Sequence, residues 1–462
     1  MRLQAIGLKE EGGRQTLVLD VQGPQTLNRV LNAFGSLLGK GLLENTPELG
    51  IHQIQPWLNG KQLKTWKVPE AGKLEQTTPI SISEIDLLEK QVIGYEDYLG
   101  IIEKLKVVPG LNVYPIARSY QGRVVHAIEL LPQCQGWLPR TKWITEHPTL
   151  YINSRHHANE VSSTNASFRT LRELLTDPKY RDLPEKVNLV FVPYENVDGA
   201  AIHYELQKEN PEWKLHVARY NALGMEMAYG YFDDQSIHSE CMAFTRTWRN
   251  WLPDIIVDDH GVPSHEWDQQ FSGYTSPWFK GFWMPRALLY SYFYHVRDEN
   301  YMANVAVNKA MEAVVAKSLR KDAQIRAMNQ DWRERFEKYA HAWMPALFPA
   351  DYFEDMISYW IPSPYSPAHR YVAVRYPWIT AVSFVSEVSD ETAQGDYLEL
   401  CARAHMTHDL AIIDWLCTAG MVFENSQKWR GATAVINHQR KRPILFADSA
   451  QKGHENEGGK RK

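Results

Sequence analysis

The stretch LYINSRHHANEVSSTNASF, residues 150–168, decides the fold. Its first four residues predict a short apolar strand, and apolar residues at helical spacing over 160–176 predict an amphipathic helix. Between the two lies the polar turn RHHANE, residues 155–160. Strands that pass through polar turns into helices are typical of α/β proteins, in which the carboxyl ends of the strands form the ligand crevice.

Three more polar clusters follow apolar strands further along the chain. They are YENVDG after 187–192, DDHG at the end of 254–259, and SEV after 379–385. Four clusters at four strand ends indicate one site rather than four unrelated loops. Because predicted strands and helices alternate over 93–450, we expect one α/β domain there, with a mixed, mostly parallel sheet covered by helices on both faces.

The two ends of the chain differ from this domain. Residues 1–92 predict a small N-terminal α+β domain, with strands at 16–21 and 80–85 and a helix over 25–43. This region carries no chemical motif, so packing, oligomerisation and substrate gating all remain open roles. Residues 451–462 are charged and glycine-rich without apolar content, which predicts a disordered tail.

Composition narrows the possible partners and location. The 462 residues carry a net charge of −5 and 44% hydrophobic residues, which predicts a globular chain that binds neither nucleic acid nor a membrane. No run is long and apolar enough for a transmembrane helix, and the first residues lack the apolar core of a secretory signal. The four cysteines form no CxxC pair, so we expect reduced thiols and a cytoplasmic location. The oligomeric state is not predicted.

The four clusters supply the residues of a catalytic zinc site. Such a site takes three protein ligands, commonly imidazoles and a carboxylate, and leaves one position open for water. His157, Glu160 and His260 are the predicted metal ligands, and Glu387 is the carboxylate that activates the metal-bound water. His156 is a weaker rival for the metal, since only His157 gives the HxxE spacing. Asp258 or Asp259 is expected to orient an imidazole from behind.

Taken in order, these motifs resemble those of the carboxypeptidase A-like zinc metallopeptidases. The resemblance covers about residues 95–416 and rests on HANE (157–160), NVDG (196–199), DDHG (258–261) and SFVSE (383–387), with ARSYQGRVV (117–125) resembling the family's Ser-x-x-Gly-Arg hairpin. It implies a mixed eight-stranded sheet, one zinc ion per chain and hydrolysis of a peptide or amide bond.

Other positions depart from the family pattern or fit it loosely. The Asn-Arg pair that grips a substrate's terminal carboxylate in the family is not found before His260, and Arg219 is the nearest substitute, as a carboxylate or oxyanion group. Tyr365 has a suitable spacing for the family's assisting phenol, and Tyr371 and Tyr376 compete with it. The aromatic stretch 271–283 is either a cleft lining or a loop packed on the core, and loop polarity explains His265 and Glu266 better than a second polar layer does.

The leading hypothesis is therefore zinc-dependent, carboxypeptidase-like hydrolysis of a peptide or peptide-like amide. One alternative is a zinc-dependent deacylase of small N-acyl amino acids, for which the missing Asn-Arg pair leaves room. The other is a pseudoenzyme that binds peptides without cleaving them. The substrate's identity cannot be read from the sequence.

Overall fold

The computed structural model describes residues 2–11, 14–39, 51–68, 78–132, 140–213, 216–261, 290–296, 298–342, 345, 351–430 and 433–444. The predicted tail 451–462, the aromatic stretch 271–283, the pair His265 and Glu266, and Cys134 lie outside these residues. The chain divides into two compact units, Met1–Thr78 and Pro79–Lys462. The boundary lies earlier than the expected residue 92, because Ile82, Leu87 and Ile93 are part of the core of the second unit.

The N-terminal unit is a small sheet with one helix. Strand β2 pairs antiparallel with β1 and parallel with β3, and two short strands extend the sheet beside β3. Its elements are β1 (Arg2–Glu11), β2 (Arg14–Gln22), α1 (Leu27–Gly39), β3 (Ile51–Leu58), β4 (Lys61–Gln62) and β5 (Trp66–Lys67). A Cβ atom at Gly35 would lie 2.1 Å from the Trp66 indole, so only glycine lets this ring pack against α1. The α+β composition expected of this region is what the structure shows.

The strand expected at 80–85 is wrong. Residues Ile82–Glu84 form a 3-10 helix, η2, instead. The Ser81 side chain accepts a hydrogen bond at the start of this turn, and Glu84 Oε1 accepts one from the Ser81 backbone N–H at 3.1 Å. This reciprocal capping satisfies the free N–H groups of a helix start, and it outweighs the alternation of Ile and Ser that favoured a strand.

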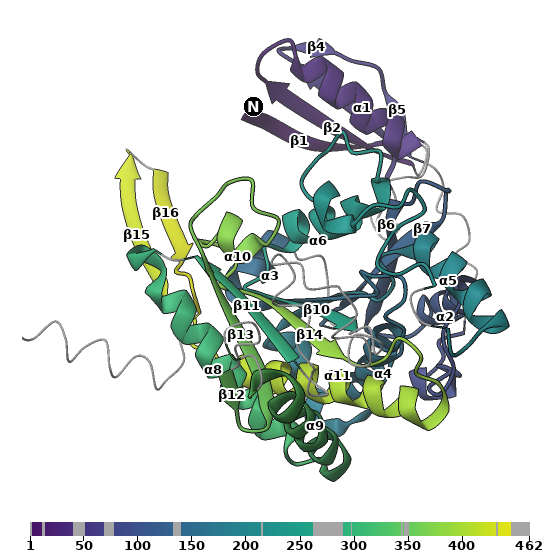
Figure 1. Ribbon diagram of the computed structural model, residues 1–462. Coiled ribbons are helices and arrows are strands. Elements are labelled where there is room, and N and C mark those ends of the chain that lie inside the picture. The colour runs from purple at the N-terminus through teal and green to yellow at the C-terminus, as the bar shows by residue number, and fades with distance from the viewer. Residues whose placement is uncertain are drawn as a thin grey trace, which may run out of the picture. The chain divides into compact units, whose positions relative to one another are not determined.

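Within the described residues, the second unit is built on a nine-stranded sheet (Figure 1). The strand order is β12-β13-β11-β14-β10-β8-β9-β7-β6. The strands are β6 (Leu111–Arg118), β7 (Val124–Leu130), β8 (Thr149–Ser154), β9 (Asn188–Val192), β10 (Ile255–Gly261), β11 (Tyr290–Val296), β12 (Asp351–Phe353), β13 (Met356–Ser363) and β14 (Val382–Val388). The α/β class is confirmed, with nine described strands in place of eight.

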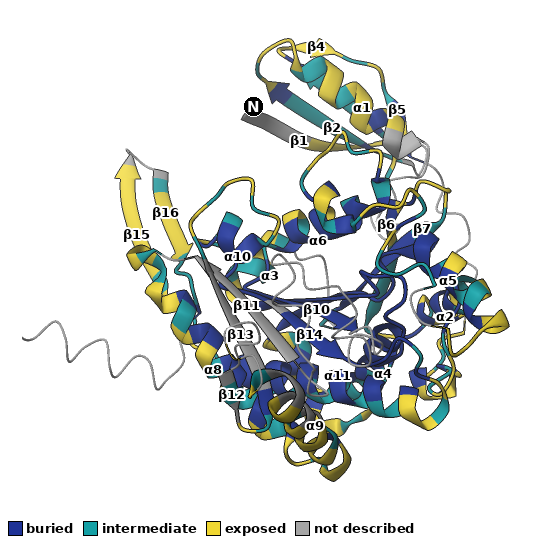
Figure 2. Ribbon diagram, viewed as in Figure 1, coloured by how far each residue is buried: buried dark blue, intermediate teal, exposed yellow. Residues whose placement is uncertain are grey.

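The sheet is mixed rather than mostly parallel. The pairs β14–β10, β10–β8, β8–β9 and β11–β13 are parallel, and the other four neighbouring pairs are antiparallel. The parallel strands β8, β9, β10 and β14 lie at the centre of the sheet and are buried (Figure 2). Parallel strands are covered by helices on both faces, which explains their nearly continuous apolar sequences.

Helices cover both faces of this sheet (Figure 1). Helices α4 and α11 pack against one face, where Ser154 of β8 contacts Ser167 and Ser386 of β14 contacts His405. Helix α6 packs on the other face, where Phe244 contacts Tyr151 of β8. The helices are α2 (Tyr95–Leu105), α3 (Arg140–Glu146), α4 (Ser162–Thr176), α5 (Val197–Glu209), α6 (Met242–Trp251), α8 (Met302–Leu319), α9 (Ala323–Phe336), α10 (Val372–Arg375) and α11 (Gly395–Leu416).

A separate hairpin of β15 (Phe423–Arg430) and β16 (Thr433–Arg440) follows α11. Arg440 of β16 binds the buried Asp254 with Nη2 at 2.6 Å from Oδ1, which fixes the end of the hairpin at the start of β10. Among the described helices, none has the length and apolar character needed to cross a bilayer.

The alternation of side chains along the central strands decides which residues share a face. In β10, Asp258 and His260 point to one face and Asp259 to the other, since Asp258 Oδ1 accepts a hydrogen bond from Asn153 and Asp259 Oδ1 accepts one from Ser386. Glu387 is the register partner of His260. The polar side chains at this end of β10 therefore lie on opposite faces of the sheet, with Asp258 and His260 on one face and Asp259 on the other.

Candidate active site

The turn after β8 is held in place by a buried arginine. Arg155 has a φ of 57°, and its Nε donates to the carbonyl of Ala158 at 2.9 Å. The Arg155 guanidinium lies 5.4 Å from the centre of the Tyr194 ring. The Asn159 N–H donates to the carbonyl of Ala218 at 3.2 Å, which joins the turn to a second loop. These contacts fix the backbone that carries His157 and Glu160.

Three side chains from this turn and from β10 converge on one point. His157 Nδ1 lies 2.5 Å from Glu160 Oε1, and His260 Nδ1 lies 3.0 Å from Glu160 Oε2. The two Nδ1 atoms lie 3.1 Å apart. The structure thus brings together the three residues that the sequence indicated as metal ligands, and they form one of the groups able to hold a metal ion.

The donor set fits a zinc ion. Two nitrogen ligands roughly 2.1 Å from a tetrahedral zinc ion would lie about 3.4 Å apart, close to the separation of the two Nδ1 atoms. Glu160 Oε2 is buried and receives no well-formed hydrogen bond from any described residue. Burial would raise the pKa of Glu160, but the imidazoles of His157 and His260 outweigh it and lower that pKa. A charged carboxylate at this position favours a cation.

Carboxylates hold the far side of both imidazoles. His260 Nε2 lies 2.9 Å from Asp258 Oδ2, and His157 Nε2 lies 3.3 Å from Glu226 Oε2. The acceptor at His260 Nε2 keeps the proton on that atom and leaves Nδ1 for a metal. Asp258, not Asp259, therefore orients the imidazole of His260. Burial lowers the pKa of His157, and the Arg219 charge acts in the same direction.

His156 has a different set of contacts. Its Nδ1 lies 3.0 Å from Glu195 Oε2 and its Nε2 lies 2.7 Å from Glu226 Oε1, so carboxylates engage both ring nitrogens. Burial would lower the pKa of His156, but these hydrogen bonds raise it to about 10. Of the two neighbouring histidines, His157 is the one that shares a donor group with both Glu160 and His260. The Tyr231 hydroxyl contacts both His156 and Glu195, and it lies 2.8 Å from His156 Nδ1.

Glu387 and Arg219 lie beside the three converging side chains. Glu387 is buried at the end of β14, in register with His260. Arg219 Nη2 lies 3.1 Å from His157 Nε2, and its Nε lies 2.9 Å from Glu226 Oε2. Burial would lower the pKa of Arg219, but Glu226 and Glu160 raise it, with smaller contributions from Tyr371 and Glu387. These interactions place one permanent cation among the acidic groups of the site.

The three tyrosines considered as assisting phenols lie in different surroundings. Tyr371 is close enough to Arg219 to contribute to the rise of its pKa. Tyr365 is 46% exposed, and its ring lies 6.1 Å from that of Trp378. Tyr376 is stacked on Trp248 at 4.5 Å and serves packing. Of the three, Tyr371 has a described electrostatic interaction with Arg219, and no described contact joins Tyr365 to a predicted ligand.

The NVDG motif and the hairpin between β6 and β7 form one structural unit. Asp198 Oδ1 accepts hydrogen bonds from Ser119 Oγ at 2.6 Å and from Arg123 Nη1 at 2.9 Å. Asn196 Oδ1 accepts one from the Gly199 N–H at 3.1 Å, at the start of α5. A Cβ atom at Gly199 would lie 2.3 Å from the carbonyl oxygen of Tyr220, so a side chain there would displace the loop that carries Arg219.

Sequence patterns did not indicate three residues of the site, namely Glu226, Glu195 and Tyr231. Glu226 caps the short helix η5 (Met227–Gly230), in a stretch without helical or strand periodicity. Glu195 lies in the YENVDG cluster, but nothing in that cluster distinguished it from its neighbours. A glutamate directly before the NVDG motif was the signal available.

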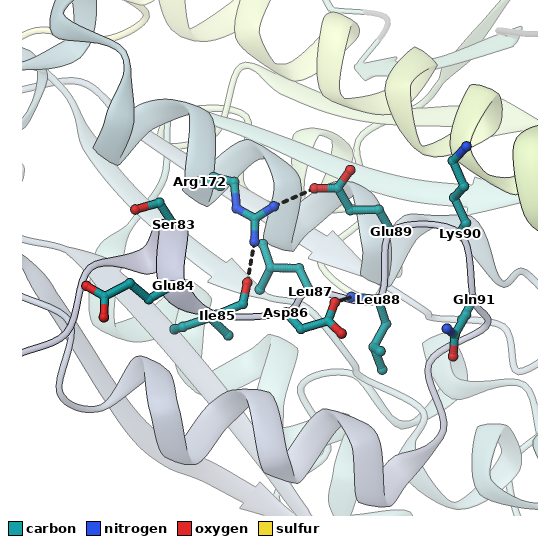
Figure 3. A pocket seen from close by; sticks show the side chains of 10 residues that line it. All are labelled: Ser83, Glu84, Ile85, Asp86, Leu87, Leu88, Glu89, Lys90, Gln91 and Arg172. Carbon is teal, nitrogen blue, oxygen red and sulfur yellow. Dashed lines mark hydrogen bonds and ion pairs between the residues drawn. The ribbon is translucent and has the colours of Figure 1, made fainter.

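One surface hollow lies away from these residues. It has a volume of about 520 Å³ and is lined by 83–91 and Arg172 (Figure 3). Arg172 crosses it and binds Glu89 Oε1 at 2.5 Å and the carbonyl of Ile85. These contacts hold the segment before α2 against α4 and suggest no chemistry.

Comparison with known proteins finds one family that is similar to the central region. Residues 103–274 match the zinc carboxypeptidase family. This region is therefore similar to the zinc carboxypeptidases. The match includes His157, Glu160 and His260 and ends before Glu387. No curated protein matches the chain.

Several solved structures are similar at low identity. A metallo-carboxypeptidase from Pseudomonas aeruginosa in complex with (2-guanidinoethylmercapto)succinic acid has 15% identity and a TM-score of 0.43, and the match covers 70% of this chain and 69% of that one. A metallo-carboxypeptidase from Burkholderia cenocepacia has 14% identity and a TM-score of 0.42, with 69% of each chain covered. The carboxypeptidase A of Helicoverpa armigera has 11% identity and a TM-score of 0.43, with 74% of this chain and 76% of that one covered. The similarity to the zinc carboxypeptidases rests on the family match and not on these structures.

Proposed function

We propose that this protein hydrolyses a peptide or peptide-like amide bond, with one zinc ion held by His157, Glu160 and His260 and with Glu387 as the general base. The convergence of two Nδ1 atoms 3.1 Å apart on both oxygens of Glu160 carries the proposal. Zinc in such a site acts as a Lewis acid toward a carbonyl and makes a bound water more acidic.

The position of Glu387 in the sheet supports its proposed role as the base. Its carboxylate leaves the sheet beside His260, on the face that also carries Asp258. From there Glu387 takes a proton from water and returns it to the leaving amine, a role that contributes about 10²- to 10⁴-fold in rate. The charge on Glu387 is balanced by Arg219, whose pKa it helps to raise.

Arg219 and Tyr371 are the candidates for stabilising the oxyanion. Arg219 is held by Glu226, which fixes the guanidinium beside His157. A fixed cation needs no reorganisation when negative charge develops on the carbonyl oxygen, so its stabilisation of the transition state is large. Tyr371 would donate its O–H to the same oxygen.

A carboxypeptidase also needs a group that binds the terminal carboxylate of its substrate. Arg219 Nε is engaged by Glu226, which favours an oxyanion role over a carboxylate grip. Arg370 is exposed, and its guanidinium lies 4.9 Å from the Tyr229 ring and 6.0 Å from the Tyr371 ring. Arg370 is therefore a candidate for binding a C-terminal carboxylate at the edge of the site.

A substrate panel tests the proposal and separates its alternatives. Zinc-loaded full-length protein is assayed on a peptide library with free and amidated C-termini and on N-acyl amino acids. Carboxypeptidase-like action predicts cleavage of free C-termini and little of the amidated peptides. Equal cleavage of both would exclude anchoring by the carboxylate, and activity confined to N-acyl amino acids would indicate a deacylase. Zinc binding without any hydrolysis would contradict the proposal and support the pseudoenzyme.

A further inference from the structure

A second buried cluster lies on the opposite face of the sheet from the proposed active site. Asp259 follows Asp258 in β10 and points toward α11, where Ser386 Oγ donates to Asp259 Oδ1 at 2.7 Å. Helix α11 presents His405, His408 and Asp409 to this point. Their spacing of three and four residues places them on one side of the helix. The site described above uses none of these groups.

The cluster has the donors of a metal site. Asp259, His408 and Asp409 each offer a ligand atom, and the three atoms lie within 4.8 Å of one another. All three side chains are 0% exposed. Asp259 Oδ2 and Asp409 Oδ2 are buried and accept no hydrogen bond from any described residue. His405 Nδ1 lies 3.2 Å from Asp259 Oδ1 and holds that carboxylate in place.

Two enclosed carboxylates need a compensating positive charge. In the described part of the chain, no hydrogen bond or ion pair joins Asp259 or Asp409 to a lysine or arginine. Burying an uncompensated carboxylate costs several kcal/mol, so either a proton or a cation must occupy this position. Burial and the charge of Asp259 raise the pKa of Asp409, which makes the proton the competing occupant.

We propose that Asp259, His408 and Asp409 form a second metal site, which binds a divalent transition-metal ion and serves the fold rather than catalysis. Two carboxylates and an imidazole suit Zn²⁺ or Mn²⁺. The bound ion replaces the proton of Asp409, and that proton passes to solvent. Since Asp259 precedes His260, the ion fixes the end of β10 against α11 and steadies the imidazole on the other face.

Metal counting on the full-length protein tests this site independently of the proposed activity. The variant His157→Ala/Glu160→Ala removes two ligands of the catalytic site. After loading with Zn²⁺ and dialysis, we expect about two zinc ions in the wild type, one in this double variant, and none when Asp409→Asn is added. The matched control is Asp414→Asn, an aspartate on the same helix that pairs with Lys179 at the surface and should lose no zinc.

Thermal unfolding supplies a second readout that needs no substitution in the cluster. Zn²⁺ should raise the Tm of the His157→Ala/Glu160→Ala variant, because an ion that binds only the folded state stabilises it. The proposal is overturned if this double variant retains no zinc and shows no rise in Tm, or if adding a folded Asp409→Asn leaves its zinc content unchanged. The cluster would then be a hydrogen-bonded network that shares a proton.

Discussion

His157 Nε2 lies 3.3 Å from Glu226 Oε2, on the side of the ring opposite to the Nδ1 atom that faces Glu160. The same Glu226 oxygen lies 2.9 Å from Arg219 Nε. One carboxylate therefore orients both a proposed metal ligand and the cation beside it.

Replacing Glu226 with glutamine keeps the size of this side chain and removes its charge. We expect zinc affinity to fall by about 10- to 100-fold, because His157 and Arg219 lose the negatively charged group that orients both of them. Competition with a chelator of known affinity measures the change. The exposed Glu212→Gln in the same part of the chain is the control and should leave the affinity unaltered. Equal affinities for both variants would show that Glu226 does not act through His157.

The two candidate phenols give opposite expectations. Tyr371→Phe should lower kcat by about 10- to 100-fold with little change in folding, since it removes a hydroxyl near Arg219. Tyr365→Phe should leave kcat within about twofold, because the ring is exposed beside Trp378. Steady-state kinetics on one peptide compares the two variants. A large loss in the Tyr365 variant alone would reverse this assignment.

Gly261 ends β10 where no side chain fits. A Cβ atom at this position would lie 1.9 Å from Asp390 Oδ1 and 2.9 Å from Glu160 Cβ. Because Ser162 donates to Asp390 through both its N–H and its Oγ at 2.6 Å, the carboxylate cannot easily move aside. Gly261→Ala should lower the free energy of unfolding by about 1–3 kcal/mol.

The control for this substitution lies in α2. Gly100 is exposed, with no atom within 4 Å of its Cβ position, so Gly100→Ala should stabilise the helix by about 0.5–1 kcal/mol. Chemical denaturation of both variants gives the comparison. Two shifts of the same sign would contradict the steric account.

The buried His126 should make the folded protein less stable in acid. Burial against the Tyr98 hydroxyl lowers the pKa of His126 to about 4, below the ordinary value near 6.5. The unfolded chain therefore binds a proton at a higher pH than the folded chain does. The neutral imidazole makes its full contribution to the free energy of unfolding above about pH 6.5, and this contribution is lost as the pH falls toward 4. Between pH 7 and pH 5 this one group accounts for about 1–2 kcal/mol.

The variant His126→Gln separates this group from the others that titrate in the same range. Glutamine cannot take up a proton, so the variant should lose less stability than the wild type between pH 7 and pH 5. Denaturant titrations at both pH values measure the difference. Parallel losses in the two proteins would show that His126 is not the group responsible.

Local sequence patterns predicted the residues of the site better than the sheet around them. The strand and helix flanking His157 show clear periodicity, and β10 brings His260 to the same edge by parallel pairing with β8. The order of β11 and β14 could not be read in this way. These strands pair antiparallel, and strand direction is set by contacts distant in sequence. Glu226 could not be predicted for a related reason, because its loop is distant from His157 in the sequence and lies beside it only in the folded chain.

Two expectations remain predictions. The cytoplasmic location rests on cysteine usage, and in the described residues Cys241, Cys401 and Cys417 are free thiols. The role of Met1–Thr78 is not explained by its fold.

The most direct test of the account is the zinc content and turnover of Glu387→Gln beside the wild type. We predict an unchanged number of bound zinc ions and a fall in kcat of at least about 100-fold, since the substitution removes the base and leaves His157, Glu160 and His260 in place. Turnover equal to that of the wild type at equal zinc content would contradict the assignment of Glu387 and the central claim with it.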